Sequence, residues 1–178
     1  MSRGLDMPQY DIAAHNAVFY DRISYEDNAQ YYLIWSVLVK RAGGDLDMRT
    51  VDRAYRFMRN HEIDGLFYPP RLKPDQKNFR TYHDMLEYED DDAPSSNQGF
   101  HCGALFAARE LGYDISDAEI AKAKEGYKRM FNAEGGYMAT SLKQQHRIGQ
   151  DSLYGEVLTY CVFGEKLLPD EMVRTHLE

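Results

Sequence analysis

The sequence predicts an all-α protein built from three consecutive α-hairpins. Apolar stretches at helical spacing alternate with amphipathic stretches, and this alternation occurs three times along the chain. One order of features recurs as well: a helical stretch, a glycine turn, a second helical stretch and a further glycine-containing segment. Repeated helix pairs of this size are typical of helical arrays in which each unit packs against its neighbours.

The first helix pair is predicted at residues 27–42 and 47–60. Residues 27–42 leave almost no polar face, so we expect a buried helix that ends at Gly43-Gly44. Residues 47–60 carry arginines between apolar residues at helical spacing, which indicates a surface helix that is buried on one side. Those apolar residues are Met48, Val51, Ala54, Tyr55 and Met58.

The second pair is predicted at residues 96–111 and 117–131. Residues 96–111 are apolar and small, which again favours a buried helix. Residues 117–131 are rich in lysine, and Ser116 with Glu119 three residues later is the sequence signature of a helix N-terminus. Apolar inner helices covered on all sides and amphipathic outer helices covered on one side are what a two-layer α/α array requires.

The third pair begins like the other two and stops early. An apolar helix is predicted from Leu153 to Phe163, and a further helix begins near Pro169. The first copy spans 36 residues from Asn28 to Asp64 and the second spans 37 from Asn97 to Glu134, so a third copy that starts at Asp151 would close at about residue 187. We therefore expect residues 1–178 to form a single domain that is part of a larger helical array.

The connections between the predicted helices differ in length. Links within each pair are short, whereas residues 61–95 and 132–149 form long links between pairs. Long connections in a compact domain are usually functional. Both lead to the N-termini of apolar helices, where free backbone N–H groups favour acidic side chains and polar ligands. The sequence therefore places the chemistry in these two links.

Carboxylates crowd the first long link. Six of the nine residues 84–92 are acidic, and Asn97-Gln98 follows at the helix start. Crowded carboxylates raise one another's pKa, and a carboxyl group that stays protonated near neutral pH can donate a proton to a glycosidic oxygen. The alternatives are a solvated acidic loop and a loop that holds a calcium ion.

Three segments of the chain carry a resemblance to a known group of enzymes. They are Tyr82-His83-Asp84 with the acidic turn and Ser95-Ser96-Asn97-Gln98-Gly99, then Gly135-Gly136-Tyr137-Met138-Ala139-Thr140-Ser141, and finally Ile148-Gly149-Gln150-Asp151-Ser152-Leu153-Tyr154-Gly155. Together they resemble the (α/α)6-toroid glycosidases, the six-hairpin group that contains trehalase-like, glucosidase-like and glycogen-debranching-type enzymes. The resemblance covers most of residues 25–175 and implies that this chain forms roughly half of a toroid.

The resemblance also implies a sugar crevice at the end where the inner helices begin, with two carboxylates flanking the scissile bond. Asp84 is on that basis the predicted general acid, and the alternative is a structural hydrogen-bond acceptor. Asp151 and Glu156 lie near the start of an inner helix and are candidates for the second catalytic carboxylate. In this group that residue often comes from a later hairpin, which this chain lacks. An inverting pair needs roughly 6.5–9.5 Å between carboxyl groups and a retaining pair roughly 5–5.5 Å.

Seven residues are predicted to bind the sugar. Amide side chains both donate to and accept from hydroxyl groups, and tyrosine offers a flat apolar face that can stack on a sugar ring. Helix capping is the alternative role of the amides, and core packing is that of the tyrosines. The predicted residues are Tyr82, Asp90, Asn97, Gln98, Tyr137, Gln150 and Tyr154.

Charge and motifs disfavour several other classes of protein. The net charge of -8 argues against nucleic acid and anionic membrane as partners, because both would be repelled. The histidines lack zinc-ligand spacing and there is no glycine-rich phosphate loop, so no metal or other cofactor is expected. No apolar run approaches the ~20 residues that span a bilayer and the first residues lack a signal-peptide core, which favours a soluble, cytoplasmic protein.

The two cysteines are predicted to be free thiols. Cys102 and Cys161 each lie inside an apolar stretch of a predicted helix, and nothing else indicates a small domain held together by disulfides. We therefore expect both side chains to be buried.

The sequence thus predicts a glycoside hydrolase-like protein that acts on or binds oligosaccharide through a carboxylate general acid. The alternative is a non-catalytic α/α module that binds carbohydrate or protein, a fragment without the second catalytic carboxylate. A half toroid exposes two apolar helix edges, so we expect either a homo-oligomer or a missing half of the toroid on another chain.

Overall fold

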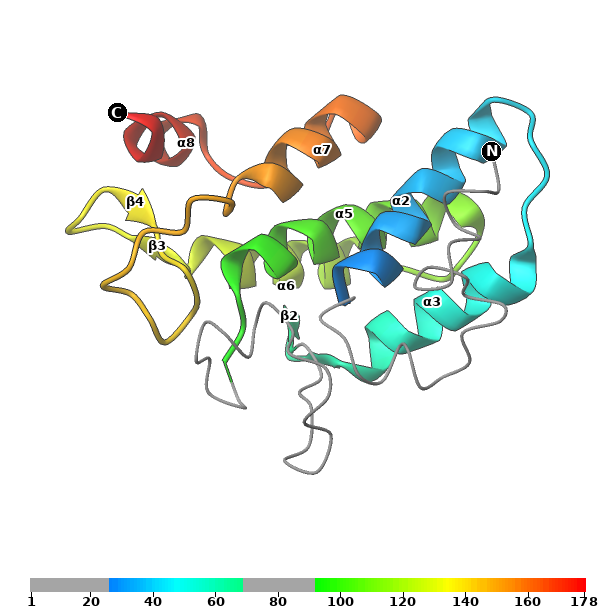
Figure 1. Cartoon of the computed structure of the whole chain (residues 1–178), viewed down its shortest axis with the longest axis horizontal. Coiled ribbons are helices and arrows are strands. Elements are labelled where there is room, and N and C mark those ends of the chain that lie inside the picture. The colour runs from blue at the N-terminus through cyan, green and yellow to red at the C-terminus, as the bar shows by residue number, and fades with distance from the viewer. Residues whose placement is uncertain (1–25, 69–91) are drawn as a thin grey trace, which may run out of the picture.

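The computed structural model describes residues 26–68 and 92–178, which form an all-α protein (Figure 1). The predicted all-α class is confirmed. Within the described residues, six α-helices are accompanied by two antiparallel hairpins of very short strands. In chain order the elements are α2 (Glu26–Arg41), α3 (Met48–Asn60), β1 (Glu62–Ile63), β2 (Leu66–Phe67), α5 (Ser95–Leu111), α6 (Asp117–Lys128), β3 (Phe131–Asn132), β4 (Tyr137–Met138), α7 (Tyr154–Phe163) and α8 (Asp170–Leu177).

The helix boundaries follow the local signals in the sequence. Helix α2 ends just before Gly43, whose φ of 74° is the left-handed conformation that glycine adopts at helix C-termini. Helix α6 begins with the predicted capping box, because the Ser116 side chain and the Glu119 side chain each bond to the other's backbone N–H. It ends at Lys128 rather than at the predicted residue 131, since the chain turns there into β3.

Each of the first two helix pairs is followed by a β-hairpin that was not predicted. Strands β1 and β2 are joined by Asp64-Gly65, and both residues have positive φ, 57° and 78°. Positive φ at both central positions is the signature of the type I′ turn, for which Asp-Gly is a favoured pair. Strands β3 and β4 pair in the same way around a longer turn that contains Gly136 at φ 72°. The repeating unit is therefore two helices and a β-hairpin.

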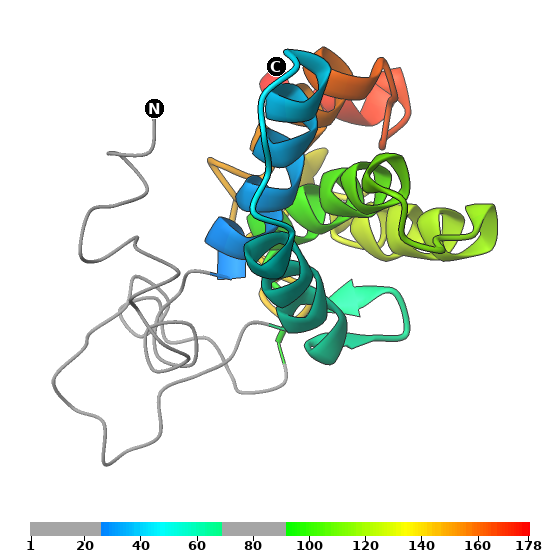
Figure 2. The same ribbon diagram turned by 90° about the vertical axis from the view of Figure 1, so that its right-hand side faces the viewer.

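Helix α5 lies between α2 and α7, and the three helices run in the same direction (Figures 1 and 2). Their C-terminal ends are tied together by Arg41 of α2. Its guanidinium forms two bonds to the Glu110 carboxylate of α5, at 2.7 and 2.6 Å, and a third to the Val162 carbonyl of α7 at 2.6 Å. Helices α3 and α6 pack against α2 and α5, respectively.

The contact between α5 and α7 depends on glycine. A Cβ atom at Gly155 would lie 2.2 Å from the carbonyl carbon of Gly99, so the two backbones meet at a distance that no side chain allows. One turn later, a Cβ at Gly103 would lie 2.5 Å from the Thr159 hydroxyl oxygen. This close approach fixes the N-terminal ends of α5 and α7 side by side.

The third unit departs from the first two. Helix α8 packs against β4, where the Met138 N–H donates to Nδ1 of His176 at 3.0 Å, and a groove separates α8 from α7. Helix α7 exposes Tyr154, Val157 and Tyr160, by 62%, 58% and 53%. The prediction that inner helices are covered on all sides is therefore wrong for α7, because no neighbour covers that face within the described residues.

The cysteine prediction is confirmed in part. Cys102 and Cys161 are both free thiols, and Cys102 is fully buried in α5. Cys161 is exposed, so its predicted burial is wrong. It lies in the same apolar pattern as Cys102, but on the open side of α7.

Candidate functional site

The N-terminal ends of α5 and α7 form one end of the fold, together with the segment from residue 139 to residue 153. This end collects six of the ten sequence-predicted site residues. Asn97 and Gln98 lie in the first turn of α5, and Gln150 and Asp151 precede α7, which holds Tyr154 and Glu156. Tyr137 lies nearby on β4. Tyr82, Asp84 and Asp90 lie outside the described residues.

A buried carboxylate, Asp92, organises this end and was not among the predicted site residues. Its Oδ1 accepts the backbone N–H groups of Ala93, at 2.9 Å, and Lys143, at 3.0 Å. Its Oδ2 accepts the hydroxyl of Ser141. Asp92 therefore joins the start of α5 to the segment before α7. The signal available in the sequence was its place as the last residue of the acidic run.

Two serines and a tyrosine complete this junction. The hydroxyl groups of Ser95, on α5, and Ser152, just before α7, are hydrogen-bonded to each other. The Ser152 carbonyl also accepts the hydroxyl of Tyr127, which is fully buried on α6. A network of this kind, with each polar group satisfied, rigidifies the surface above it.

Gln98 is fully buried and committed to the fold. Its Oε1 accepts the Phe67 N–H at 2.9 Å, and its Nε2 donates to the carbonyls of Gly65, at 2.8 Å, and Ala123, at 3.2 Å. These bonds use both amide protons, so the side chain joins the first β-hairpin to the second helix pair and has no donor left for a ligand. Asn97 is fully buried as well.

Tyr137 is also held by protein partners. Its hydroxyl donates to the Gln145 carbonyl at 3.1 Å and accepts from the Asn132 side chain at 3.3 Å. The Asn132 amide reaches the same carbonyl at 2.8 Å. The Tyr137 hydroxyl therefore fastens the segment after β4 to the second hairpin. This is a structural role, the alternative to sugar binding that the sequence analysis gives for the tyrosines.

Glu156 is a buried carboxyl group in the first turn of α7. Its Oε2 accepts the backbone N–H groups of Leu167, at 2.9 Å, and Leu168, at 3.1 Å, which fastens the segment before α8 to α7. Burial raises the pKa of Glu156, and the two N–H donors reduce this effect without cancelling it. A carboxyl group of this kind is a proton donor if substrate reaches it.

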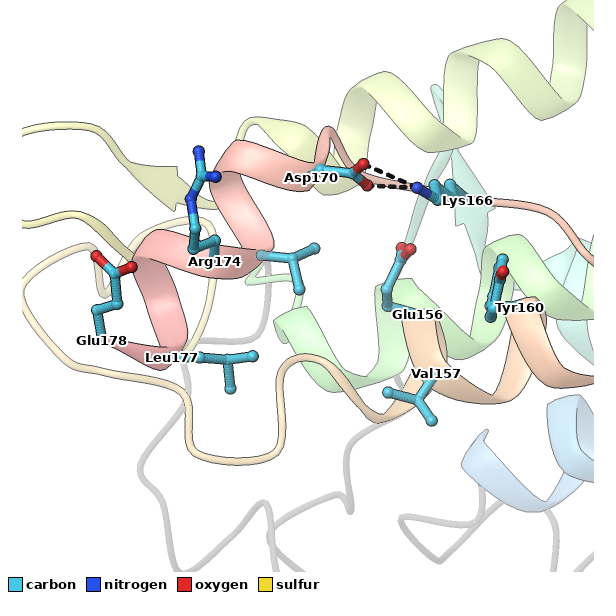
Figure 3. Close-up of a pocket in the computed structure, with 9 residues that line it drawn as sticks. Glu156, Val157, Tyr160, Lys166, Asp170, Arg174, Leu177 and Glu178 are labelled. Carbon is cyan, nitrogen blue, oxygen red and sulfur yellow. Dashed lines mark hydrogen bonds and ion pairs between the residues drawn. The ribbon is translucent and has the colours of Figure 1, made fainter.

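Glu156 also lines the groove between α7 and α8, which has a volume of about 560 Å³ (Figure 3). The Lys166–Asp170 ion pair, at 2.7 Å, lies beside it. Val157 and Leu177 provide apolar walls. The groove combines one buried acid with apolar side chains, in contrast to the polar end of the fold.

Among the predicted residues that the structure describes, Gln150, Asp151 and Tyr154 form a group at the start of α7 that is at least partly exposed. Gln150 is exposed, Asp151 is partly exposed, and Tyr154 is 62% exposed. They follow Gly149, whose N–H donates to the Met138 carbonyl at 2.9 Å and thereby fixes the segment to β4. An amide, a carboxylate and an aromatic ring thus lie within five residues at the start of α7.

The described residues contain neither a metal-binding cluster nor a membrane-spanning helix. Among residues 26–68 and 92–178, no three His, Cys, Asp or Glu side chains lie close enough together to hold a metal ion. None of the helices described is both long and apolar enough to cross a membrane.

These residues define an all-α protein of repeated helix pairs, with an accessible polar cluster where its last inner helix begins. Comparison with protein-family models, with curated proteins and with solved structures finds no match to this chain. The family suggested by the sequence segments therefore stays a prediction.

Proposed function

We propose that this protein binds an oligosaccharide at the start of α7 and is a glycoside hydrolase-like protein of the α/α-toroid type. The cluster of Gln150, Asp151 and Tyr154 carries the proposal. An exposed tyrosine face suits a sugar ring, and an amide beside a carboxylate suits its hydroxyl groups. The rigid junction below, built on Asp92 and Ser152, holds the cluster in place.

The repeating unit supports the toroid type. Two consecutive units have the order inner helix, outer helix and β-hairpin. The hairpin of the first unit packs against α6, the outer helix of the second unit, and the hairpin of the second unit packs against α8 in the same way. Three parallel inner helices, the first two with an outer helix packed against each, support the half toroid that the resemblance implies.

Hydrolysis requires a general acid and a second carboxylate. Asp84 is proposed as the acid on the resemblance alone. Asp151 is the better partner among the described residues, because Glu156 is tied to the N–H groups of Leu167 and Leu168. A non-catalytic carbohydrate-binding module is the alternative, and it uses the same accessible cluster without turnover.

Binding is tested by titrating the full chain with α-linked disaccharides and longer oligosaccharides, followed by calorimetry. Tyr154→Ala is expected to weaken binding about two- to tenfold, since a lost ring contact costs about 0.5–1.5 kcal/mol. Tyr160→Ala is the matched control, because Tyr160 is a second exposed tyrosine on α7, more than one turn away. No binding, or equal losses in both variants, would contradict the proposed site.

Catalysis is tested separately with aryl glycosides and the same oligosaccharides. Asp84→Asn and Asp151→Asn are each expected to lower the rate by about 10²–10⁴-fold if these groups are the acid and its partner. Binding without turnover by the unaltered chain would establish the non-catalytic alternative and exclude hydrolysis by this chain alone. Activity that survives both substitutions would remove the two residues from the mechanism.

A further inference from the structure

The groove between α7 and α8 has the size and the lining of a small-molecule site. Its volume of about 560 Å³ lies within the range of roughly 300–1,000 Å³ that is usual for ligand pockets. Val157 and Tyr160 from α7 and Leu177 from α8 form apolar and aromatic walls, and they are 58%, 53% and 73% exposed. A ligand with an apolar body would cover these side chains.

One polar side chain of the groove is buried and incompletely bonded. Glu156 is 7% exposed, and its Oε2 accepts the N–H groups of Leu167 and Leu168. Within the described residues, no donor reaches its Oε1. Buried carboxylates in proteins are usually paired with a cation. Burial accordingly raises the pKa of Glu156, since its charged form lacks such a partner.

The lysines around Glu156 are bound to other carboxylates. Lys166 donates to both oxygens of Asp170, at 2.7 and 2.8 Å. Lys124 on α6 forms an ion pair with Glu165 at 3.5 Å. Each of these charges is balanced by its own partner, so Oε1 of Glu156 stays available to a ligand.

An aromatic ring lies next to this carboxyl group. Tyr160 follows Glu156 by four residues on α7, and Figure 3 shows both side chains on the same side of the helix. A carboxylate attracts an ammonium group through a charge-assisted hydrogen bond, and an aromatic face attracts it through its quadrupole. The two groups together therefore favour a cationic ligand over a neutral one.

We propose that the groove between α7 and α8 binds a small amine with an apolar body, with its ammonium group at Oε1 of Glu156 and its apolar part along Val157 and Leu177. The ammonium group supplies the donor that the fold does not. The apolar body covers walls that are otherwise exposed. The proposal is independent of the oligosaccharide-binding function, because Tyr154 lies outside the lining of this groove.

Three probes that share one indole skeleton test the charge of the ligand. The full chain is titrated with tryptamine, tryptophol and indolepropionate by calorimetry. Tryptamine should bind at least ~10-fold more tightly than tryptophol, because its hydrogen bond to Glu156 is charge-assisted. Equal affinities for the amine and the alcohol would overturn the proposal. Tighter binding of the carboxylate would overturn it in favour of an anion at Arg174, which lies at the outer edge of the groove (Figure 3).

A charge-removing variant tests the role of Glu156. Glu156→Gln should bring tryptamine to the affinity of tryptophol, and its amide oxygen can still accept both N–H groups. Glu171→Gln is the matched control, since it removes the same charge from an exposed position of α8 outside the groove. Circular dichroism checks that both variants are folded. Equal losses in the two variants would exclude Glu156 as the ammonium site.

Two tyrosine variants test the location and do not depend on the fold of Glu156→Gln. Tyr160→Ala should weaken tryptamine and tryptophol about two- to tenfold, because it removes an aromatic wall of the groove. Tyr154→Ala should leave both affinities unchanged, which is the reverse of the order expected for sugar binding. Equal losses in the two variants, or no binding of tryptamine up to about 10 mM, would overturn the proposal.

Discussion

At the scale of one residue, Glu156 shows how the fold changes the pKa of a carboxyl group. Burial raises its pKa from the ordinary value of 4.5, while the N–H groups of Leu167 and Leu168 act in the opposite direction. A carboxyl group whose pKa is raised in the folded state adds stability below its unfolded pKa. This contribution is lost as pH rises through the folded pKa.

We predict that Glu156→Gln is more stable than the unaltered protein at pH 7 and equally stable near pH 4. The amide oxygen still accepts both N–H groups, and the cost of ionising a buried carboxyl disappears. Glu156→Ala leaves both N–H groups without a partner and should lose about 1–3 kcal/mol. Urea unfolding at several pH values measures both effects. A Gln variant whose advantage does not grow with pH would contradict the assignment.

Glu62 provides a control of opposite sign. Burial acts to raise its pKa, but the neighbouring His101 ring and the Arg59 guanidinium outweigh burial, so the pKa lies below its usual value. The stability that Glu62 contributes is present above its unfolded pKa and lost as pH falls through the folded pKa. Glu62→Gln should therefore cost more stability at pH 7 than near pH 4, the reverse of Glu156→Gln.

The predicted site residues fall into two groups: those whose side chains are buried in the fold and those whose side chains are exposed to solvent. Gln98 and Asn97 form the amide pair that the sequence singled out, yet both are fully buried. Gln150 is the same kind of residue at the start of the next inner helix, and it is exposed. Residue type identified all three as hydrogen-bonding groups, but only their neighbours in space determine what each side chain can reach.

At the scale of elements, local signals predicted the helices well and the β-hairpins poorly. The capping box of Ser116 and Glu119 acts within one turn, so it is readable from the sequence. Asp64-Gly65 is equally local and was a usable turn signal. The sequence pattern nevertheless places it inside a long link, because strands of two residues leave too little alternation to detect.

We predict that Gly155→Ala destabilises the protein by about 3 kcal/mol, at the upper end of overpacking costs. The added methyl group would lie 2.2 Å from the backbone of Gly99 and must force α5 and α7 apart. Gly164→Ala is the control, because it has a φ of 71° and no atom within 4 Å of an added Cβ. It should cost about 1 kcal/mol, the price of the left-handed conformation. Thermal and urea unfolding compare the two, and equal losses would show that the helix contact tolerates a side chain.

At the scale of the whole molecule, the described residues form an array with two open ends. Helix α5 has a neighbour on either side, whereas α2 and α7 each expose apolar side chains. An array of this kind gains stability from each additional neighbour interface. Its stability is therefore expected to depend on association.

We predict that the melting temperature rises with protein concentration, because a contact made only by folded chains shifts the unfolding equilibrium by mass action. Leu38→Glu places a charge among the exposed apolar side chains of α2 and should weaken this dependence. It should leave the melting temperature at low concentration nearly unchanged, since Leu38 is 43% exposed. Calorimetric scans over a hundredfold range of concentration test it. A melting temperature that is independent of concentration in the unaltered chain would contradict association between copies of this chain.

The sequence by itself determined the helices, their order and their repetition, because periodicity, capping residues and glycine turns act over a few neighbouring positions. The tertiary structure decided which apolar and polar side chains stay accessible. Cys102 and Cys161 share one sequence pattern, yet only Cys102 is buried. Such differences depend on contacts between distant residues, such as that of Gly99 with Gly155. A local pattern carries no information about which helix covers which face.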